Sequence, residues 1–453
     1  MPQRWRSIKL SIILSLSAVS ILYFAACKKQ SSTDTPLPTS YYPSIIINND
    51  NQVVYALNPS SGQKNWQFGM FVPAGYSLLT PTVPIVYNPS PLLYNESVYI
   101  AYSQHDPTRT DTVFKVNART GALIKKITPN PNEIFNIQAT PIANGNLLYV
   151  AGAGVNNELY AIDTGTYVTK WEYTADGPII SSPTLYGNNL YFATTAGTIY
   201  CIDATLGPTG SSNWTYKPVD SPGAPIHASF YSSPAVSPPY LFIGSVTDSN
   251  MYCIFLNNPT TPINHTPTRW EIERWRYKTQ GPIYSSPSLY AGNCIFGCGD
   301  FRVYCLDTFI NPTSVIAPTF APTAVWVDSL YSNVYSSPYV YNQVVYIGCN
   351  NYNLYALNII NGGIKWEFAT KGLIKSSPIV YNGLVYIGSY DMYMYAVDTT
   401  FGNIKWQWNT NGQIQDAPVI DNLTGSSYNS GISGFCNGGI GNGFFYNFSG
   451  NNF

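Results

Sequence analysis

The sequence predicts an all-β fold, an eight-bladed β-propeller with four-stranded blades whose ring is closed by strands from both ends of the chain. Three observations carry this prediction. A Pro preceded by small, mostly polar residues recurs about every 40 to 50 residues, the length of one propeller blade. Each repeat continues with short apolar runs and tight turns, and nearly every repeat reaches a Trp. The repeated Pro residues are Pro91, Pro141, Pro183, Pro234, Pro287, Pro338, Pro378 and Pro418.

The first three strands of a blade are clearest in residues 376–406, which align without a gap on residues 336–366. Each of these units opens on Ser-Ser-Pro, which begins the first strand. The second and third strands, Val385–Gly388 and Met394–Val397, are apolar on both faces, as expected of strands between two neighbouring blades. Asp391 and Met392 lie between them and predict a hairpin turn.

The fourth strand follows an outer turn and carries the Trp. In the same unit the turn is Asp398–Gly402, where Gly supplies a positive φ, and Trp406 follows. The same spacing recurs at Gly62–Trp66, Gly210–Trp214 and Gly362–Trp366. A large planar side chain repeated in this way is expected to wedge between adjacent blades rather than to contact a ligand. The structural docking residues are Trp66, Trp171, Trp214, Trp275, Trp326, Trp366 and Trp406, whereas Lys125 fills this position in the unit of Pro91.

The two ends of the repeat region complement each other. Residues 44–68 hold three strands without a Pro-led first strand, while Gln413–Asp421 hold such a first strand without partners. Joining them in one sheet removes the exposed edges of an open array and completes the eighth blade. We therefore expect a single propeller domain over residues 44–421.

The N-terminus reads as a processing segment. Residues 1–26 have a basic start and an apolar core, and Phe24-Ala25-Ala26-Cys27 resembles the lipobox of bacterial lipoproteins. The resemblance implies that Cys27 is the lipidated first residue of the mature chain. The alternatives are an ordinary secretory signal and a retained transmembrane helix, which the short, Ser-interrupted apolar stretch disfavours. Residues 27–43 then form the anchor and a flexible tether. Lys28 and Lys29 directly follow Cys27, where acidic residues direct some lipoproteins to the cell surface, and this favours the periplasm.

The segment 422–453 is rich in Gly, Asn and aromatic residues and carries no charge. Low complexity predicts a loosely ordered tail. Extra strands over the closing blade are the alternative, and the sequence leaves both open.

Charge and cysteine usage narrow the function. Charged residues make up 10% of the chain and nearly cancel, so nothing indicates nucleic-acid binding. Cys201, Cys253 and Cys305 occupy a repeat position that is Ala in other units, which indicates packing residues. A disulfide among Cys294, Cys298 and Cys305 stays open, and their spacing does not match a metal site.

No catalytic set is visible in the sequence. The three His residues fall in turns or loops, and the chain has no nucleophile elbow, Gly-rich phosphate loop or His-Glu metal motif. The recurrent carboxylates after the third strand, such as Asp163 and Asp398, are expected to bond to their own turns.

The repeat Leu354-Tyr355-Ala356-Leu357-Asn358, with Gly362 and Trp366, resembles the tryptophan-docking repeat of the pyrroloquinoline quinone (PQQ) dehydrogenase-like propellers. The resemblance covers residues 44–421. That superfamily includes quinoprotein dehydrogenases and non-catalytic lipoproteins such as the propeller subunit of the outer-membrane β-barrel assembly machinery. The dehydrogenases bind PQQ and calcium and use a catalytic Asp, and many have a disulfide between adjacent Cys residues; no position here matches that set.

A candidate binding site lies where the first strands begin, because these strands are innermost in this blade design. The residue three before each Pro should approach the axial channel, which predicts a ring of Gln138, Ile180, Tyr231, Tyr284, Tyr335, Lys375 and Gln415. Aromatic and polar side chains around a funnel suit a peptide segment or a glycan. The alternative is that they only fill and solvate the channel mouth.

Two functions remain. The first is a non-enzymatic, membrane-tethered module that binds envelope proteins or carbohydrate and acts as a monomer within a complex, with no cofactor and no metal. The second is a quinoprotein-like oxidoreductase that needs PQQ and calcium. The lipobox, the tether and the compact repeats favour the first.

Overall fold

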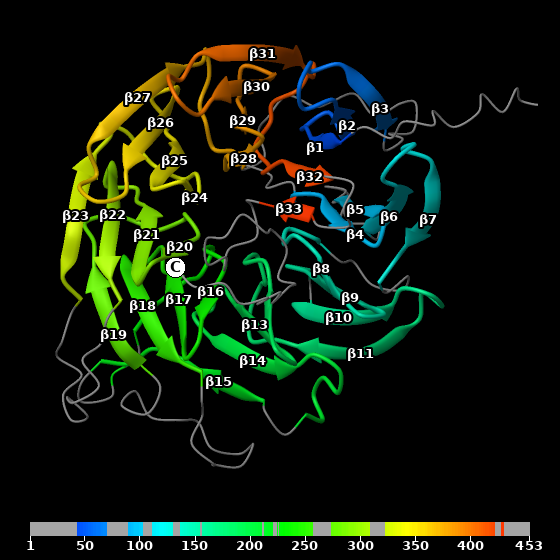
Figure 1. Cartoon of the computed structure of the whole chain (residues 1–453). Helices are drawn as coiled ribbons and strands as arrows, with labels where there is room; N and C mark the ends of the chain where they lie inside the picture. Colours follow the sequence, from blue (N-terminus) through cyan, green and yellow to red (C-terminus); the bar gives the residue numbers. More distant parts are fainter. Residues whose placement is uncertain are drawn as a thin grey trace, which may run out of the picture. The chain divides into compact units, whose positions relative to one another are not determined.

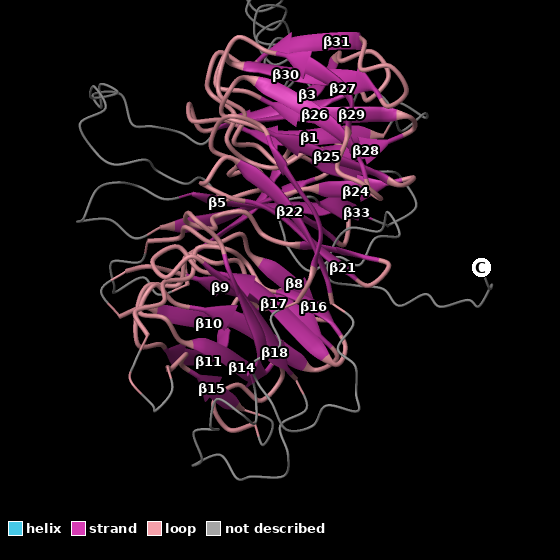
Figure 2. Ribbon diagram, turned by 90° about the vertical axis from the view of Figure 1, so that its left-hand side faces the viewer, coloured by secondary structure: helices cyan, strands magenta, loops and turns pink. Residues whose placement is uncertain are grey.

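The computed structural model describes residues 43–69, 89–102, 111–129, 136–154, 156–210, 213–220, 224, 226–256, 273–308, 322–421 and 427–429. All their regular structure is β-strand, arranged as eight sheets around one axis (Figures 1 and 2). The predicted eight-bladed propeller is thereby confirmed. No helix within the described ranges is long and apolar enough to span a membrane. The predicted signal peptide, Cys27 and tether up to residue 42 lie outside these ranges.

Seven blades take four consecutive strands each, from the axis outward, and we number them 1 to 7 along the chain (Figure 1). Blade 1 contains β4 (Leu92–Tyr94), β5 (Ser97–Tyr102), β6 (Thr112–Asn117) and β7 (Leu123–Ile127). Blade 2 contains β8 (Ile142–Asn144), β9 (Leu147–Ala151), β10 (Glu158–Asp163) and β11 (Thr169–Thr174). Blade 3 contains β12 (Thr184–Tyr186), β13 (Asn189–Ala193), β14 (Ile199–Asp203) and β15 (Trp214–Tyr216). Blade 4 contains β16 (Ala235–Ser237), β17 (Tyr240–Gly244), β18 (Asn250–Phe255) and β19 (Glu273–Lys278). Blade 5 contains β20 (Ser288–Tyr290), β21 (Asn293–Gly297), β22 (Arg302–Asp307) and β23 (Ala324–Ser329). Blade 6 contains β24 (Tyr339–Tyr341), β25 (Val344–Gly348), β26 (Asn353–Asn358) and β27 (Ile364–Ala369). Blade 7 contains β28 (Ile379–Tyr381), β29 (Leu384–Gly388), β30 (Tyr393–Asp398) and β31 (Ile404–Asn409).

The closing blade joins the two ends of the repeat region, as predicted. Its strand order is β3-β2-β1-β32-β33, and β1 pairs with β32 antiparallel, with Ser44 opposite Asp421 and Ile46 opposite Val419. The short β33 adds a fifth strand beside β32, so the start of the C-terminal segment supplies one extra strand. The bounds are β1 (Ser44–Asn48), β2 (Val53–Leu57), β3 (Lys64–Gly69), β32 (Val419–Asp421) and β33 (Ser427–Asn429).

The core lies between the blades, because the second and third strands are buried on both faces. Alternate residues of a strand point to opposite faces, so Ile45 and Ile47 pack with Tyr386 of blade 7, while Ile46 packs with Val98 of blade 1. The outermost strands alternate between buried and exposed residues, as in β31. Each sheet therefore contributes to two adjacent clusters, and removing one blade would expose two apolar faces.

The docking Trp residues bridge neighbouring blades at the outer turns. Trp406 of blade 7 packs on Gly62 of the closing blade, where a Cβ would lie 2.7 Å from the indole, and its Nε1–H donates to Pro59 O at 2.7 Å. Glycine is required at this position both by its φ of 71° and by the close approach of the ring. The same arrangement recurs for Trp66 on Gly121, Trp171 on Gly207, Trp326 on Gly362 and Trp366 on Gly402.

One glycine predicted for an outer turn is wrong. The outer-turn Gly of blade 3 is Gly207, with φ of 59°, not Gly210. Gly207 receives Trp171, whereas a Cβ at Gly210 would collide with Asp203 of its own turn. The longer outer turn of this blade places a second Gly at the predicted spacing by coincidence.

The cysteines pack as expected. Cys201, Cys253 and Cys305 are buried in three different inter-blade clusters. Every cysteine within the described ranges has a free thiol, including Cys294 and Cys298. The disulfide that the sequence left open is absent from this part of the chain.

Candidate functional site

The first strands converge on one cavity at the propeller axis, with a volume of about 170 Å³. The residues of the predicted ring all line it, together with seven of the eight residues that come just before a repeated Pro. From these elements the lining takes Gln138, Ile180, Tyr231, Tyr284, Tyr335, Lys375 and Gln415, as well as Asp416. The structure thus brings the predicted residues together, while their role in binding stays a prediction.

One side of the cavity is aromatic. Tyr231, Tyr284 and Tyr335 come from blades 4, 5 and 6 and contact one another edge to face, with centroid distances of 5.5 and 4.9 Å. Lys375, Gln415 and Gln138 come from blade 7, the closing blade and blade 2. The wall is therefore apolar over three consecutive blades and polar over much of the rest.

A chain of hydrogen bonds holds the first strands around the cavity. In seven blades the residue before the repeated Pro donates its backbone N–H to the hydroxyl of the equivalent residue in the next blade, at 2.9 to 3.1 Å. The preceding Ser acts within its own blade, as when Ser285 Oγ accepts from Gly297 N at 3.1 Å. This explains why the repeat opens on Ser-Ser-Pro. The equivalent residues are Ser90, Thr140, Ser182, Ser233, Ser286, Ser337, Ser377 and Ala417.

The closing blade departs from this pattern and brings an Asp residue into the lining of the cavity, with its carboxyl group buried. Asp416 stands where blades 3 to 7 have the first Ser, and only 5% of its surface is exposed. Its Oδ2 is buried without a hydrogen-bond partner. Burial, and then the nearby Asp50 carboxyl, raise the pKa of Asp416 well above its ordinary value. Sequence reasoning missed Asp416, although its departure from the repeat was a visible signal.

Lys375 brings a positive charge to the same cavity. Its Nζ lies 4.9 Å from the centroid of the Tyr390 ring. Burial lowers its pKa. Within the described part of the chain, Lys375 makes no ion pair, with Asp416 or with any other carboxylate. One acidic and one basic side chain thus belong to the lining of one small cavity without pairing.

We expect Asp416→Asn to stabilise the protein at neutral pH. The folded chain holds the Asp416 proton more tightly than the unfolded chain, so this group lowers stability as the pH rises above its unfolded pKa. An amide cannot ionise, so the variant avoids this loss, and the gain near pH 7 should be about 1–3 kcal/mol, because each unit of pKa difference between the two states corresponds to about 1.4 kcal/mol. It should shrink below about pH 4, where the carboxyl is protonated in both states. Denaturant unfolding of both proteins at the two pH values measures the difference, and a pH-independent difference would contradict the prediction.

Blade 1 explains the exception to the Trp pattern. Lys125 takes the Trp position, and the outer turn of blade 2 carries Tyr167, with φ of 61°, where other turns carry Gly. The Lys125 Nζ lies 5.1 Å from the Tyr167 centroid, and Lys115 Nζ lies 5.5 Å from it. The aromatic ring between these blades therefore comes from the receiving turn, and cation–π contacts replace the indole.

This exchange predicts coupled substitutions. Lys125→Trp alone should destabilise the protein because the indole meets the Tyr167 ring, and Tyr167→Gly alone should destabilise it because a ring is lost. Together they should restore the arrangement of the other blades, with a favourable coupling of about 0.5–3 kcal/mol. Unfolding of the four proteins measures the coupling, and additive effects would show that the two positions do not exchange roles.

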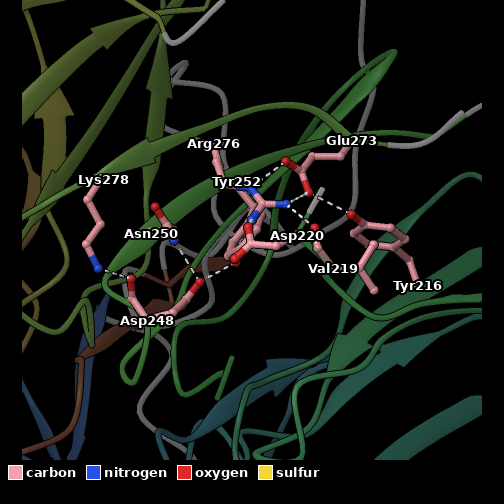
Figure 3. A network of polar contacts seen from close by, with 9 residues as sticks. All are labelled: Tyr216, Val219, Asp220, Asp248, Asn250, Tyr252, Glu273, Arg276 and Lys278. Carbon is pink, nitrogen blue, oxygen red and sulfur yellow. Dashed lines mark hydrogen bonds and ion pairs between the residues drawn. The ribbon is translucent and has the colours of Figure 1, made fainter. Parts of the chain in front are cut away.

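A second polar cluster lies between the outer strands of blades 3 and 4 (Figure 3). Arg276 donates from Nε and Nη2 to Glu273 at 2.6 and 2.7 Å, and from Nη2 to Val219 O at 2.9 Å. Tyr216 donates to the same Glu273 carboxylate at 2.6 Å. Because these groups satisfy one another across a blade interface, we interpret the cluster as structural.

The axial cavity does not offer the ligands that a PQQ–calcium pair would need. Calcium takes six to eight oxygen ligands, several of them carboxylates. Among the described residues of the lining, Asp416 is the only one with a carboxyl group, and the Lys375 ammonium opposes a cation. No three His, Cys, Asp or Glu side chains in the described ranges group as a metal site requires.

These features define a PQQ-like propeller, a ring of Trp-docked blades around an axial cavity. The family model described as outer membrane protein assembly factor BamB matches residues 50–245 and 321–431, more than half of the chain. The chain therefore belongs to this family. No curated protein matches the sequence significantly.

Solved structures with the same fold include enzymes and an assembly factor. BamB from Moraxella catarrhalis matches with a TM-score of 0.53 and 15% identity, over 80% of this chain and 90% of that one. A europium-containing methanol dehydrogenase matches with a TM-score of 0.56 and 12% identity, over 76% and 82%. Quinohemoprotein alcohol dehydrogenase ADHIIG from Pseudomonas putida HK5 matches with a TM-score of 0.55 and 13% identity, over 77% and 70%. At these identities the likeness shows the fold alone.

Proposed function

We propose that this protein is a lipid-anchored envelope lipoprotein whose propeller is a non-enzymatic binding or scaffold module for an envelope protein or a glycan. The observation that carries the proposal is the axial cavity, whose lining combines three Tyr rings with polar side chains. Membership of the BamB family supports a scaffold role. The lipobox at Cys27 supports anchoring, with the propeller facing the periplasm at the outer membrane.

The propeller face on which the axial cavity opens also carries exposed apolar side chains, which extend the proposed binding surface beyond the cavity. The hairpins between second and third strands place Phe301, Tyr352 and Met392 at equivalent positions in blades 5, 6 and 7, with φ of 74°, 75° and 73°. Such backbone conformations are strained for bulky residues. Their carbonyls accept from the loops that lead to the first strands, so they lie on the face where the axial cavity opens. Tyr331, in one of these loops, is 84% exposed.

Affinity capture tests the scaffold function. The full-length lipoprotein, solubilised from its native membrane, should recover a defined partner, and Tyr284→Ala with Tyr335→Ala should lose it. Phe401→Ala is the matched control, because this exposed ring lies on an outer turn of the opposite face. Unchanged recovery with the Tyr double variant would exclude the axial ring, and equal loss with the control would exclude a face-specific contact.

The alternative is a quinoprotein-like oxidoreductase, because two dehydrogenases share this fold. It predicts a bound-quinone absorbance and dye-linked alcohol oxidation when PQQ and calcium are added to the protein. The scaffold proposal predicts neither.

A further inference from the structure

The propeller has a second face, on the side opposite to the opening of the axial cavity. The outer turns and the turns between first and second strands form it together, because backbone hydrogen bonds join them, as from Thr399 N to Gly383 O at 3.0 Å. We call it the outer-turn face.

Large apolar side chains are exposed on one part of this face. They lie in the outer turns and at the start of the outermost strands of blades 6, 7 and 1, which surround the closing blade (Figure 1). Apolar groups gathered at a surface in this way indicate an interaction site. The exposed fraction is 45–74% for Leu123, Ile124, Ile360, Ile364, Phe401 and Ile404.

The charge exposed on the same part of the face is mainly basic. Lys64 and Lys365 lie at the start of outermost strands, are exposed and make no ion pair within the described part of the chain. The Asp398 carboxylate is directed into its own turn, where it accepts two backbone N–H groups, and its side chain is only 12% exposed. Glu96 is exposed but is offset by Arg119 at 2.7 Å. Lysines beside exposed apolar side chains are typical of surfaces that bind anionic membranes.

The chain enters the propeller at this face, in the closing blade. β1 begins at Ser44, and Asn65, next to an outer turn, donates from Nδ2 to Ser44 Oγ at 2.8 Å. The proposed lipid on Cys27 lies 16 residues before Pro43, a length that spans at most roughly 55 Å when fully extended. A tether this short would give the outer-turn face a high effective concentration at the membrane, so that weak contacts suffice.

We propose that the outer-turn face docks on the anionic membrane that holds the lipid anchor, with its apolar side chains among the headgroups and its lysines on lipid phosphates. The inference rests on the proposed lipid anchor at Cys27, not on the axial binding surface. It adds an orientation to the scaffold function, because the axial cavity and its Tyr wall then face away from the membrane, toward a partner.

Fluorescence of the full-length lipoprotein in vesicles of phosphatidylcholine and phosphatidylglycerol tests the inference. A polarity-sensitive dye is attached to Phe401→Cys on the outer-turn face or, as the matched control, to Tyr352→Cys on the cavity face. Native thiols in the described ranges are buried, and the unsubstituted chain labelled in the same way gives the background. Brominated lipids should quench the dye at position 401 and not the dye at position 352. Equal quenching at both positions, or none at position 401, would overturn the proposal.

Substitutions around the dye assign the contact. Ile360→Ser with Ile364→Ser should remove most of the quenching at position 401, whereas Met392→Ser on the cavity face should leave it unchanged. Lys64→Gln with Lys365→Gln should weaken it, as should raising the salt concentration. Quenching that survives both double substitutions would overturn the proposal. Thermal melts show that each variant is folded.

Mass spectrometry of the N-terminal peptide separates this inference from the function on which it rests. A Cys27 without lipid would overturn the anchor and the docking together. A lipidated chain whose dye at position 401 is not quenched would overturn the docking alone and leave the scaffold function standing.

Discussion

Trp406→Ala is expected to lower the free energy of unfolding by about 3–5 kcal/mol, the range for truncating a buried aromatic side chain. Trp406 is 9% exposed, donates to Pro59 O and covers Gly62. It also packs against Tyr386 of its own blade, with a centroid distance of 5.8 Å. Since this indole joins blade 7 to the closing blade, its loss weakens the interface that completes the ring. Denaturant unfolding followed by Trp fluorescence and circular dichroism measures the effect.

The matched control for this prediction is Phe401→Ala, which removes an exposed aromatic ring from the same blade. Surface truncations of this kind usually change stability by less than about 0.5 kcal/mol. If the two variants unfolded alike, the docking Trp would not be an interface residue. Trp406→Phe, which keeps a ring but loses the hydrogen bond to Pro59, should fall between them.

Arg276→Ala is expected to cost about 3–5 kcal/mol, because it leaves the Glu273 carboxylate buried without its counter-charge. The Arg276 side chain is 14% exposed and that of Glu273 only 2%. The guanidinium also holds the loop of Val219 and Asp220 against the outer strand of blade 4 (Figure 3). The expected readout is a lower melting temperature together with early exposure of the blade 3 and 4 interface to proteolysis.

Arg119→Ala provides the comparison, because it breaks an Arg–Glu pair of similar length at the surface. Arg119 lies 2.7 Å from Glu96, and the two side chains are 48% and 70% exposed. Exposed pairs contribute about 0–1 kcal/mol, so this variant should be nearly as stable as the parent. If the two variants lost the same free energy of unfolding, burial would not determine how much an Arg–Glu pair stabilises this protein.

Most of the fold was predictable because the repeat encodes it locally. The Ser-Ser-Pro opening, two apolar runs and a Gly before a Trp recur in one order, and each position has one structural role. The pairing of Ser44 with Asp421 followed from two incomplete units that fit together. The ring around the cavity followed for the same reason, since a residue three before each Pro has the same place in every blade.

The failures arose where the chain departs from the repeat. Gly210 matched the spacing, but the longer turn of blade 3 gives the role to Gly207. Tyr167 and Lys125 exchange roles between two blades, and a pattern scored one unit at a time misses such a pair. Asp416 was overlooked because it lies beside the predicted ring position, and its burial depends on neighbours from the far end of the sequence.

The pairing of β1 with β32, which closes the ring, has a consequence for how the chain folds during synthesis. Ser44 is synthesised long before Asp421, so one backbone edge of β1 stays unpaired while the other seven blades are synthesised. Such an edge is a template for wrong strand pairing, and contacts so distant in sequence form slowly. A chain that ended before Val419 would therefore leave this edge of β1 without its partner β32.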